Sequence, residues 1–155
     1  MNSTDKQFNN YKPNPQNKKV DYGECWINPS QVANPVWKIL KFPKKTKDQQ
    51  VADFIFPDSG LSIIFLSLQF HQTYPLYLQD KLDKFAQSED YKTYDNRILL
   101  LLFDAEDPSD HLMEITLLCM EKNIKLLLGF TFTEIASYLG SFKYLEKNKG
   151  HYKLR

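Results

Sequence analysis

The side chains best placed for metal chemistry are Asp104, Glu106 and Asp107, three carboxylates at the end of the apolar run RILLLLFD. Open α/β sheets usually bind ligands at this end of a strand, and carboxylate oxygens are suitable ligands for Mg²⁺. Asp107 also precedes Pro108, a pair typical of the cap and first residue of a helix. Acidic residues stabilise a helix N-terminus without any ligand. The sequence therefore favours a capping role and leaves a metal site as the weaker alternative.

The three histidines form no ligand motif in the sequence. His71, His111 and His151 lie 40 residues apart each time, whereas paired metal-binding histidines on one helix stand about four residues apart. We expect each of them to have a surface or packing role. The two common glycine-rich phosphate loops do not occur among the 5 glycines, so the sequence predicts no cofactor.

Nucleophilic catalysis also finds little support. Cys119 falls on the apolar side of a predicted helix, where a thiol behaves as a small inert hydrophobic side chain. Ser67 lacks the flanking glycines of a nucleophile elbow. Cys25 and Cys119 are too few for a zinc ribbon or a disulfide scaffold, and they fit a reducing compartment.

The overall composition limits the classes of partner. Against 20 basic residues stand 19 acidic ones, which gives a net charge of +1, so the chain is no polycation that coats nucleic acid through counterion release. Any DNA contact must be local, and two lysine-rich segments, 38–47 and 143–155, are candidates, although such runs are more often solvated surface. No signal peptide and no apolar run of about 18 residues occurs, which argues against a membrane protein.

The elements that must position these side chains begin after a polar tail. Residues 1–22 are rich in Asn, Lys, Gln and Pro and are predicted to be disordered. Two Asn-Pro pairs then precede an apolar run from Val36 to Phe42. Because proline pushes the preceding residue toward extended geometry, we interpret this segment as a turn that feeds a strand. A second predicted strand, Val51 to Phe56, ends at the turn-forming residues 57–60.

The segment from Leu61 to His71 is also predicted to be extended, although its length leaves a helix open. Tyr74 and Pro75 end it, and Pro75 suits the first turn of a helix. That helix places Leu78, Leu82 and Phe85 on one side.

The second half of the chain alternates strands and helices. Residues 97–104 and 124–130 are nearly continuous apolar runs, typical of strands buried on both faces of a parallel sheet. Apolar residues then recur at helical spacing, and Thr131 and Glu134 have the spacing of a capping box. The two helical stripes are Leu112, Ile115 and Cys119, and Ile135, Tyr138, Leu139, Phe142 and Leu145. We therefore predict an α/β fold, a single three-layer domain with a mainly parallel central sheet.

Five segments follow one another in a recognisable order: NPVWKILKF, VADFIFPDSG, FLSLQFHQTYPLYLQDKL, RILLLLFDAEDPSDHLMEITLLCMEKN and IKLLLGFTFTEIASYLGSFKYLEK. They resemble the central domain of the small subunit of the XPF-type excision-repair nuclease, the family known as excision repair cross-complementing group one in animals and as the Rad ten family in yeast. The resemblance covers Trp26 to Lys147, and the combined motifs are more specific than any one alone. It implies a fold like that of the nuclease domain of the large partner.

Active nucleases of this type carry a Gly-Asp pair on one strand and a Glu-Arg-Lys triplet on the next, because phosphodiester hydrolysis needs carboxylates for the metal and a lysine for charge. Ala52 and Asp53 stand at the pair, and Ile63, Ile64 and Phe65 stand at the triplet. Apolar side chains cannot hold a hard cation. The resemblance thus implies an XPF-type fold without its catalytic residues, in a non-catalytic subunit.

In the family, the corresponding surface is a groove that docks a short peptide of the damage-recognition protein XPA and that is also linked to single-stranded DNA. The positions that match the groove are Asn34, Asp53, Phe65, Ser67, Gln69, Phe70, Tyr74 and Tyr77. Three of them depart from the family pattern, since Gln69 replaces an arginine, Phe70 a tyrosine and Tyr74 a histidine. The loss of a cation favours peptide over DNA in this groove, and core packing of the aromatic rings is the competing explanation.

The resemblance implies a DNA-repair subunit of a heterodimeric structure-specific endonuclease in the nucleus, acting in nucleotide-excision and interstrand-crosslink repair. Its expected partners are an XPF-type catalytic large subunit, an XPA-like peptide, and single-stranded or junction DNA. A scaffolding subunit of a meiotic recombination complex, which binds branched DNA without cleavage, is the main alternative. An active metal nuclease that uses Asp53 with Asp104 or Glu106 is a third and weaker one.

The expected domain organisation is a tail over 1–22, a nuclease-like domain over 23–148 and a basic end over 149–155. The helix-hairpin-helix module that follows the central domain in the family is not found in this sequence. The sequence leaves two explanations open, a fragment or a shortened family member.

Overall fold

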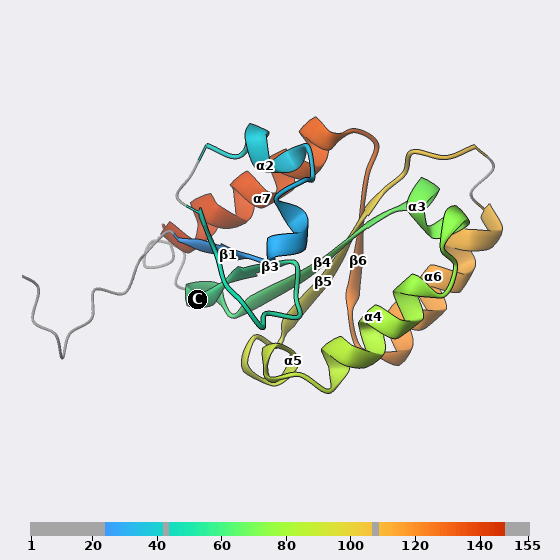
Figure 1. The fold of residues 1–155 in the computed structure, drawn as a ribbon, viewed down its shortest axis with the longest axis horizontal. Helices are drawn as coiled ribbons and strands as arrows, with labels where there is room; N and C mark the ends of the chain where they lie inside the picture. The colour runs from blue at the N-terminus through green and yellow to red at the C-terminus, as the bar shows by residue number, and fades with distance from the viewer. Residues whose placement is uncertain (1–23, 42–43, 107–108, 148–155) are drawn as a thin grey trace, which may run out of the picture.

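A six-stranded mixed sheet forms the centre of the molecule in the computed structural model, which describes residues 24–41, 44–106 and 109–147 (Figure 1). The strands are β1 (Cys25–Ile27), β2 (Lys44–Thr46), β3 (Phe54–Phe56), β4 (Leu61–Ser67), β5 (Asn96–Leu102) and β6 (Lys125–Gly129), in the spatial order β2-β1-β3-β4-β5-β6. β4, β5 and β6 are parallel, β3 is antiparallel to β1 and β4, and β2 is parallel to β1. The predicted α/β class with a mainly parallel sheet is confirmed.

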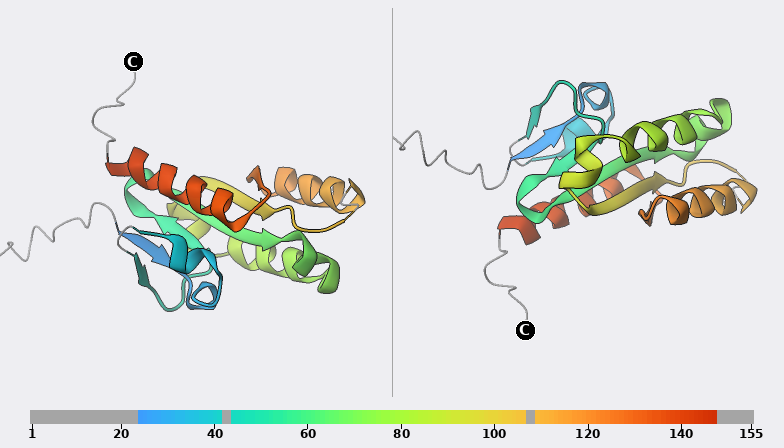
Figure 2. Two further views of the ribbon diagram at one scale, coloured as in Figure 1. Left: turned by 90° about the horizontal axis from the view of Figure 1, so that it is seen from above. Right: turned by 90° about the horizontal axis from the view of Figure 1, so that it is seen from below.

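Helices cover both faces of the sheet and make three layers (Figure 2). On one face lie α2 (Val36–Ile39) and α7 (Phe132–Lys147), and on the other lie α4 (Tyr77–Ala86) and α6 (Ser109–Glu121). The short elements are η1 (Pro29–Gln31), η2 (Pro57–Ser59), α3 (Leu68–Thr73) and α5 (Glu89–Thr93). Gly60 closes the turn after η2 with φ 63°, a left-handed conformation that glycine adopts without strain.

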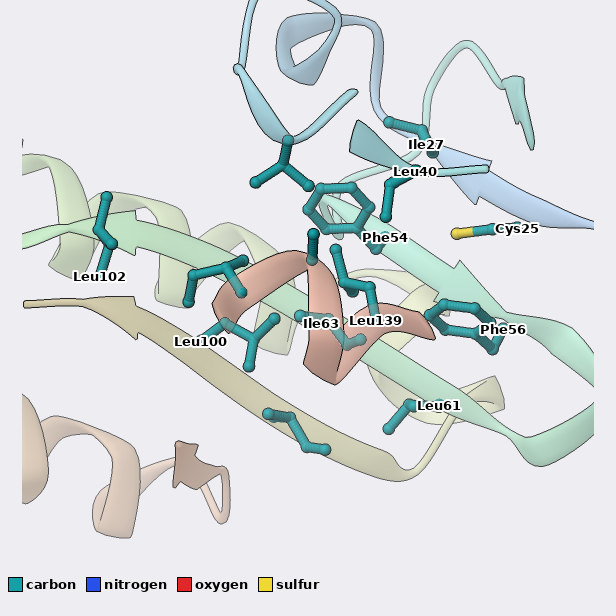
Figure 3. Close-up of a cluster of buried hydrophobic side chains, with 14 residues drawn as sticks. Cys25, Ile27, Leu40, Phe54, Phe56, Leu61, Ile63, Leu100, Leu102 and Leu139 are labelled. Atoms are coloured by element: carbon teal, nitrogen blue, oxygen red, sulfur yellow. The ribbon is translucent and has the colours of Figure 1, made fainter. Parts of the chain in front are cut away.

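Successive side chains of the central strands enter two separate hydrophobic cores, because side chains alternate between the faces of a strand. In β5, Ile98, Leu100 and Leu102 belong to the core beneath α2 and α7, which Figure 3 shows. Leu99 and Leu101 belong to the core beneath α4 and α6. A strand that is apolar at every position must be buried on both faces, and this is the physical basis of the three-layer fold.

Several predicted helices lie where the sequence placed them. Leu78, Leu82 and Phe85 of α4 are buried in the second core, and Leu112, Ile115 and Cys119 of α6 pack into the same core. The Glu134 N–H donates to Thr131 Oγ1 at 3.1 Å and so begins α7 as a cap. Of the predicted α7 stripe, Ile135 and Leu139 are buried, whereas Leu145 is exposed.

The predicted strand from Val36 to Phe42 is wrong, since Val36–Ile39 form the short helix α2. Asn34 Oδ1 accepts a hydrogen bond from the Val36 N–H at 2.9 Å, which caps the first turn. Val36 and Leu40, four positions apart, are both buried against α7. The local sequence pattern of this apolar run fits a strand as well as a helix, and only the contact with α7 shows that the helix forms.

Two other predicted strands are longer than the observed ones. In the segment Val51 to Phe56 only β3, from Phe54, is a strand, because the N–H groups of Val51 and Ala52 donate to Asp90 Oδ2 at 2.7 and 3.0 Å. The predicted extended segment to His71 ends at Ser67, which caps α3 by accepting from the Phe70 N–H. Both boundaries depend on side chains that turn the backbone away from the sheet.

Some predictions fall outside the described residues: the tail over 1–22, the Asp107–Pro108 helix start and the basic end over 149–155. Within the described ranges, none of the helices is long and apolar enough to span a membrane.

Candidate functional site

An open groove lies where β4 ends and α3 begins. It has a volume of about 430 Å³ and is bordered by the η1–α2 segment, the end of β4, α3, the start of α4 and Phe132 of α7. Five of the eight predicted groove residues line it, namely Asn34, Phe65, Ser67, Phe70 and Tyr77. Residues from four separate chain segments meet here, so the groove is a product of tertiary structure.

A second hollow of about 440 Å³ adjoins the first and is lined by Phe70, Tyr74, Leu76 and Tyr77 among others. Phe70 and Tyr77 border both hollows, and their rings meet edge to face with centroids 5.0 Å apart. The Phe70 and Tyr74 rings lie 4.8 Å apart. Phe70, Tyr74 and Leu76 are 40%, 57% and 74% exposed. A contiguous patch of this kind is typical of an interaction surface rather than of a core.

Asp53, a predicted groove residue, is instead fully buried beneath the groove. Its Oδ2 accepts from the Phe65 N–H at 2.7 Å, and its Oδ1 accepts from Gln31 Nε2 at 3.2 Å and lies 3.1 Å from Lys81 Nζ. Burial raises the pKa of Asp53 above its usual range, although Lys81 and the two hydrogen-bond donors act in the opposite direction. Asp53 is therefore part of the support of the groove.

The polar support extends from Asp53 to the groove rim. Gln31 Oε1 accepts from Asn34 Nδ2 at 3.0 Å while Gln31 Nε2 donates to Asp53. Asn34 in turn caps α2. This chain of hydrogen bonds fixes the rim residue Asn34 relative to β4. Sequence reasoning missed Gln31 and Lys81, because neither stands in a motif and both become relevant only through Asp53.

The predicted groove residue Gln69 does not line either hollow in the described structure. Its side chain is exposed, and its backbone N–H donates to Asp104 Oδ1 at 2.9 Å. Asp104 Oδ2 accepts from Ser67 Oγ at 2.7 Å. Asp104, which follows β5, thus caps α3 at the end of the neighbouring strand β4. This is a different helix from the one that sequence reasoning favoured for the acidic cluster.

The strand positions of an XPF-type metal site are adjacent here but carry the wrong chemistry for a metal. The Asp53 N–H donates to Ile63 O at 2.8 Å, so the segments at the Gly-Asp pair and the Glu-Arg-Lys triplet are side by side. Ile63 and Ile64 are fully buried in opposite cores, and Phe65 is partly buried. Asp53 stands opposite Lys81, a cation that competes with a bound metal ion. These residues hold one carboxylate and do not fit a hard divalent ion.

Among the residues that the structure describes, those that line the groove include no charged side chain. Burial and the charge of Asp53 raise the pKa of Tyr77 to about 12, so its phenol is neutral at physiological pH. The groove therefore offers aromatic faces and neutral hydrogen-bonding groups, which suit apolar and aromatic side chains of a ligand better than phosphate.

The other predicted reactive groups are distributed over the fold. Cys119 is buried in the second core, and burial raises the pKa of its thiol to about 11, which makes it unreactive. His71 and His111, which we expected to have separate surface or packing roles, lie together with Glu114 between α3 and α6. Histidine spacing gave no signal for this cluster, because His71 belongs to α3 whereas His111 and Glu114 belong to α6.

Comparison of the whole fold with solved structures defines the class of protein. The structure is similar to XPF from Aeropyrum pernix in complex with DNA, with a TM-score of 0.66 and 12% sequence identity over 82% of this chain and 66% of that chain. A second structure, XPF from Aeropyrum pernix, gives a TM-score of 0.67 and 13% identity over 85% and 65% of the two chains. The protein is thus a single α/β domain with the XPF nuclease fold.

Sequence comparison identifies the family. Residues 23–149 match the binding domain of DNA repair protein Ercc1 (rad10/Swi10), and the chain belongs to this Rad10 family, as the sequence motifs indicated.

Three curated proteins of this kind are similar to the chain in sequence. The mating-type switching protein swi10 of Schizosaccharomyces pombe is 29% identical over 136 residues, which are 87% of this chain and 52% of the relative. The DNA repair protein RAD10 of Saccharomyces cerevisiae is 31% identical over 120 residues, or 73% and 53%. The DNA excision repair protein ERCC-1 of Arabidopsis thaliana is 26% identical over 132 residues, or 85% and 31%. The chain spans about half the length of the first two relatives.

Proposed function

We propose that this chain is a non-catalytic DNA-repair subunit of a heterodimeric XPF-type endonuclease, active in the nucleus in nucleotide-excision and interstrand-crosslink repair. The observation that carries the proposal is the state of Asp53. The carboxylate that corresponds to a metal ligand is fully buried and faces Lys81 Nζ at 3.1 Å. The surface in front of it is an uncharged aromatic groove. In this proposal, the surface at this position of the fold binds a partner instead of hydrolysing DNA.

The proposed occupant of the groove is a short peptide with apolar and aromatic side chains from an XPA-like damage-recognition protein. Three observations support a peptide over DNA: the lining has no cation, Phe70 and Tyr74 present exposed rings, and the residue at the family arginine position, Gln69, lies outside the hollows. A nucleic acid held here would lack a partner for its phosphates. The eight predicted residues thus divide into a lining, a buried support and one exposed neighbour.

DNA contact is proposed for the lysine-rich segment around α2 and β2, where Lys38, Lys41 and Lys47 are exposed. Lys47 Nζ also stands 3.9 Å from the centroid of the Trp26 ring, which orients its charge. Contacts of this kind are electrostatic, so binding of a splayed-arm DNA will weaken steeply with salt.

The function is tested by purifying the chain with its partner from its own cells and sequencing the partner. A larger subunit with an intact Glu-Arg-Lys triplet supports the repair proposal. A partner whose triplet is also lost supports the alternative, a scaffold in recombination, which one relative favours through its name, a mating-type switching protein. Divalent-metal-dependent cleavage of splayed-arm DNA by the isolated chain would overturn the non-catalytic assignment.

The groove is tested by Phe70→Ala, with Phe130→Ala as a matched control, since Phe130 is a 61% exposed ring outside both hollows. Loss of the Phe70 ring should weaken capture of the XPA-like partner by about 2 kcal/mol, or roughly thirtyfold. The control should leave capture unchanged. Equal binding by both variants and the unaltered chain would contradict the groove assignment.

A further inference from the structure

His71, His111 and Glu114 form a cluster that the proposed function does not use. His71 belongs to α3, and His111 and Glu114 stand one helical turn apart on α6. One potential ligand atom from each residue lies within 4.8 Å of the others. His71 Nε2 is 3.7 Å from Glu114 Oε2, and the two imidazole rings are perpendicular with centroids 5.4 Å apart. Among the described residues, this is the only group of three or more potential His, Cys, Asp or Glu ligands.

His71 is the anomalous member of the cluster. Its side chain is 1% exposed, and within the described part of the chain neither ring nitrogen has a hydrogen-bond partner. Buried polar groups are almost always satisfied, because leaving one unpaired costs about 1–3 kcal/mol. The ring therefore has an unfilled bonding position that points toward an acidic side chain and a second imidazole.

We propose that His71, His111 and Glu114 bind a transition-metal ion of the Zn²⁺ class between α3 and α6. Two neutral imidazoles and one carboxylate are the ligand types that zinc takes in three-ligand sites, with a water or an external group in the fourth position. Imidazole nitrogen favours transition metals over Ca²⁺ and Mg²⁺, which take oxygen ligands.

The geometry requires only side-chain movement. Two ligands of a tetrahedral zinc ion at about 2.0–2.1 Å lie about 3.4 Å from each other, so the 3.7 Å between His71 and Glu114 is already close to that spacing. The remaining ligand atoms, at most 4.8 Å apart, must approach by about 1.4 Å or less. Glu114 is 53% exposed and His111 is partly exposed, so both side chains are free to rotate toward the buried and fixed His71.

A bound ion would join α3 to α6. α3 carries Phe70, one residue before His71, so the ion would also fix the wall shared by the two hollows. The three proposed ligands line neither hollow, so the metal site can form whether or not the groove is occupied.

The test is a zinc competition titration of the full, untagged chain against a colorimetric chelator, with His111→Gln and Glu114→Gln as variants. Both substituted residues lie at the surface of α6, so the fold should survive, and circular dichroism checks this. His151→Gln is the matched control, a histidine that is not among the three proposed ligands. We expect one zinc per chain, at least tenfold weaker binding in both variants, and unchanged binding in the control.

Two further measurements distinguish this site from sulfur ligation and from binding elsewhere on the chain. Zn²⁺ should raise the thermal midpoint of the unaltered chain progressively with concentration, and His111→Gln should abolish the rise. Co²⁺ in the same site should give the visible bands of a tetrahedral nitrogen and oxygen site without the near-ultraviolet band of thiolate ligation. Sulfur ligation, equal binding by His111→Gln and His151→Gln, or no binding at all would overturn the proposal; the last outcome leaves a His71–Glu114 ion pair only.

Discussion

Two buried polar groups near the carboxyl end of β4 differ in how completely their surroundings satisfy them. Asp53 has two hydrogen-bond donors and a lysine around its carboxylate, all within 3.2 Å. His71 is equally buried, yet within the described residues its ring nitrogens have no hydrogen bond. A satisfied buried charge maintains the fold, whereas an unsatisfied buried group is costly and calls for a bonding partner. The comparison supports a structural role for Asp53 and the proposed ligand-binding role for His71.

Removal of the Asp53 carboxylate should have the largest effect on stability. Asp53→Ala leaves Lys81, the Phe65 N–H and Gln31 without their acceptor, and it should lower the free energy of unfolding by about 3 kcal/mol. Urea unfolding measures the change. Zinc affinity per folded molecule should stay the same, since the cluster shares no residue with this network. A loss below about 1 kcal/mol would show that Asp53 is not a support of the fold.

Removal of the cation should give a smaller effect that depends on pH. Lys81→Met keeps the aliphatic stem but leaves the Asp53 charge unpaired, and should cost about 2 kcal/mol near neutral pH. Because burial places the pKa of Asp53 in the folded state above its unfolded value, proton uptake favours the folded state. The cost should therefore shrink as the pH falls below neutrality. A cost that grows toward acid would contradict the assigned direction of the pKa shift.

The matching change at the histidine should have the opposite sign. His71→Leu replaces an unsatisfied ring with an apolar side chain, so in metal-free buffer with a chelator the free energy of unfolding should stay unchanged or rise by up to about 1 kcal/mol. Addition of Zn²⁺ should then stabilise the unaltered chain only. A loss above about 2 kcal/mol in the chelator would mean that His71, like Asp53, is satisfied by the fold.

The last effect, which is absent at neutral pH, concerns Tyr77, which lines the groove and interacts with the charge of Asp53. Its pKa in the folded state is about 12 against an ordinary value of 10.0, so the contribution of the neutral phenol to stability is present below pH 10 and is lost as pH rises toward 12. Across this alkaline range, the free energy of unfolding of Tyr77→Phe should fall less steeply with pH than that of the unaltered chain, as urea unfolding at each pH would measure. Parallel curves for the two proteins would show that the phenol is not shielded by burial and by Asp53.

The two central strands show how much of the fold was predictable. Residues 97–104 and 124–130 are apolar at nearly every position, and only burial on both faces satisfies such a run, so β5 and β6 and the helices around them followed from pattern. Val36–Ile39 failed the same reasoning, because so short and mainly apolar a segment fits a helix and a strand equally well, and the decisive cap came from Asn34.

The groove was predicted in part. The family motifs identified Phe65, Phe70 and Tyr77, but they could not show that Asp53 is buried beneath the lining or that Gln69 lies beside it. Those outcomes depend on Lys81 and Asp104, which lie 28 and 35 residues further along the chain than Asp53 and Gln69 respectively. Contacts at that separation leave no local pattern.

The sequence by itself determined the α/β class, the main strands and helices, the family and the absence of the Glu-Arg-Lys triplet. Each of these features depends only on residue types or on short periodic patterns. Only the tertiary structure decided which polar groups are satisfied. Asp53 meets Lys81, and His71 meets His111 and Glu114, because the sheet register and helix packing bring distant segments within a few ångströms. Burial then makes each such meeting energetically significant, since an unpaired polar group loses its hydration without replacement.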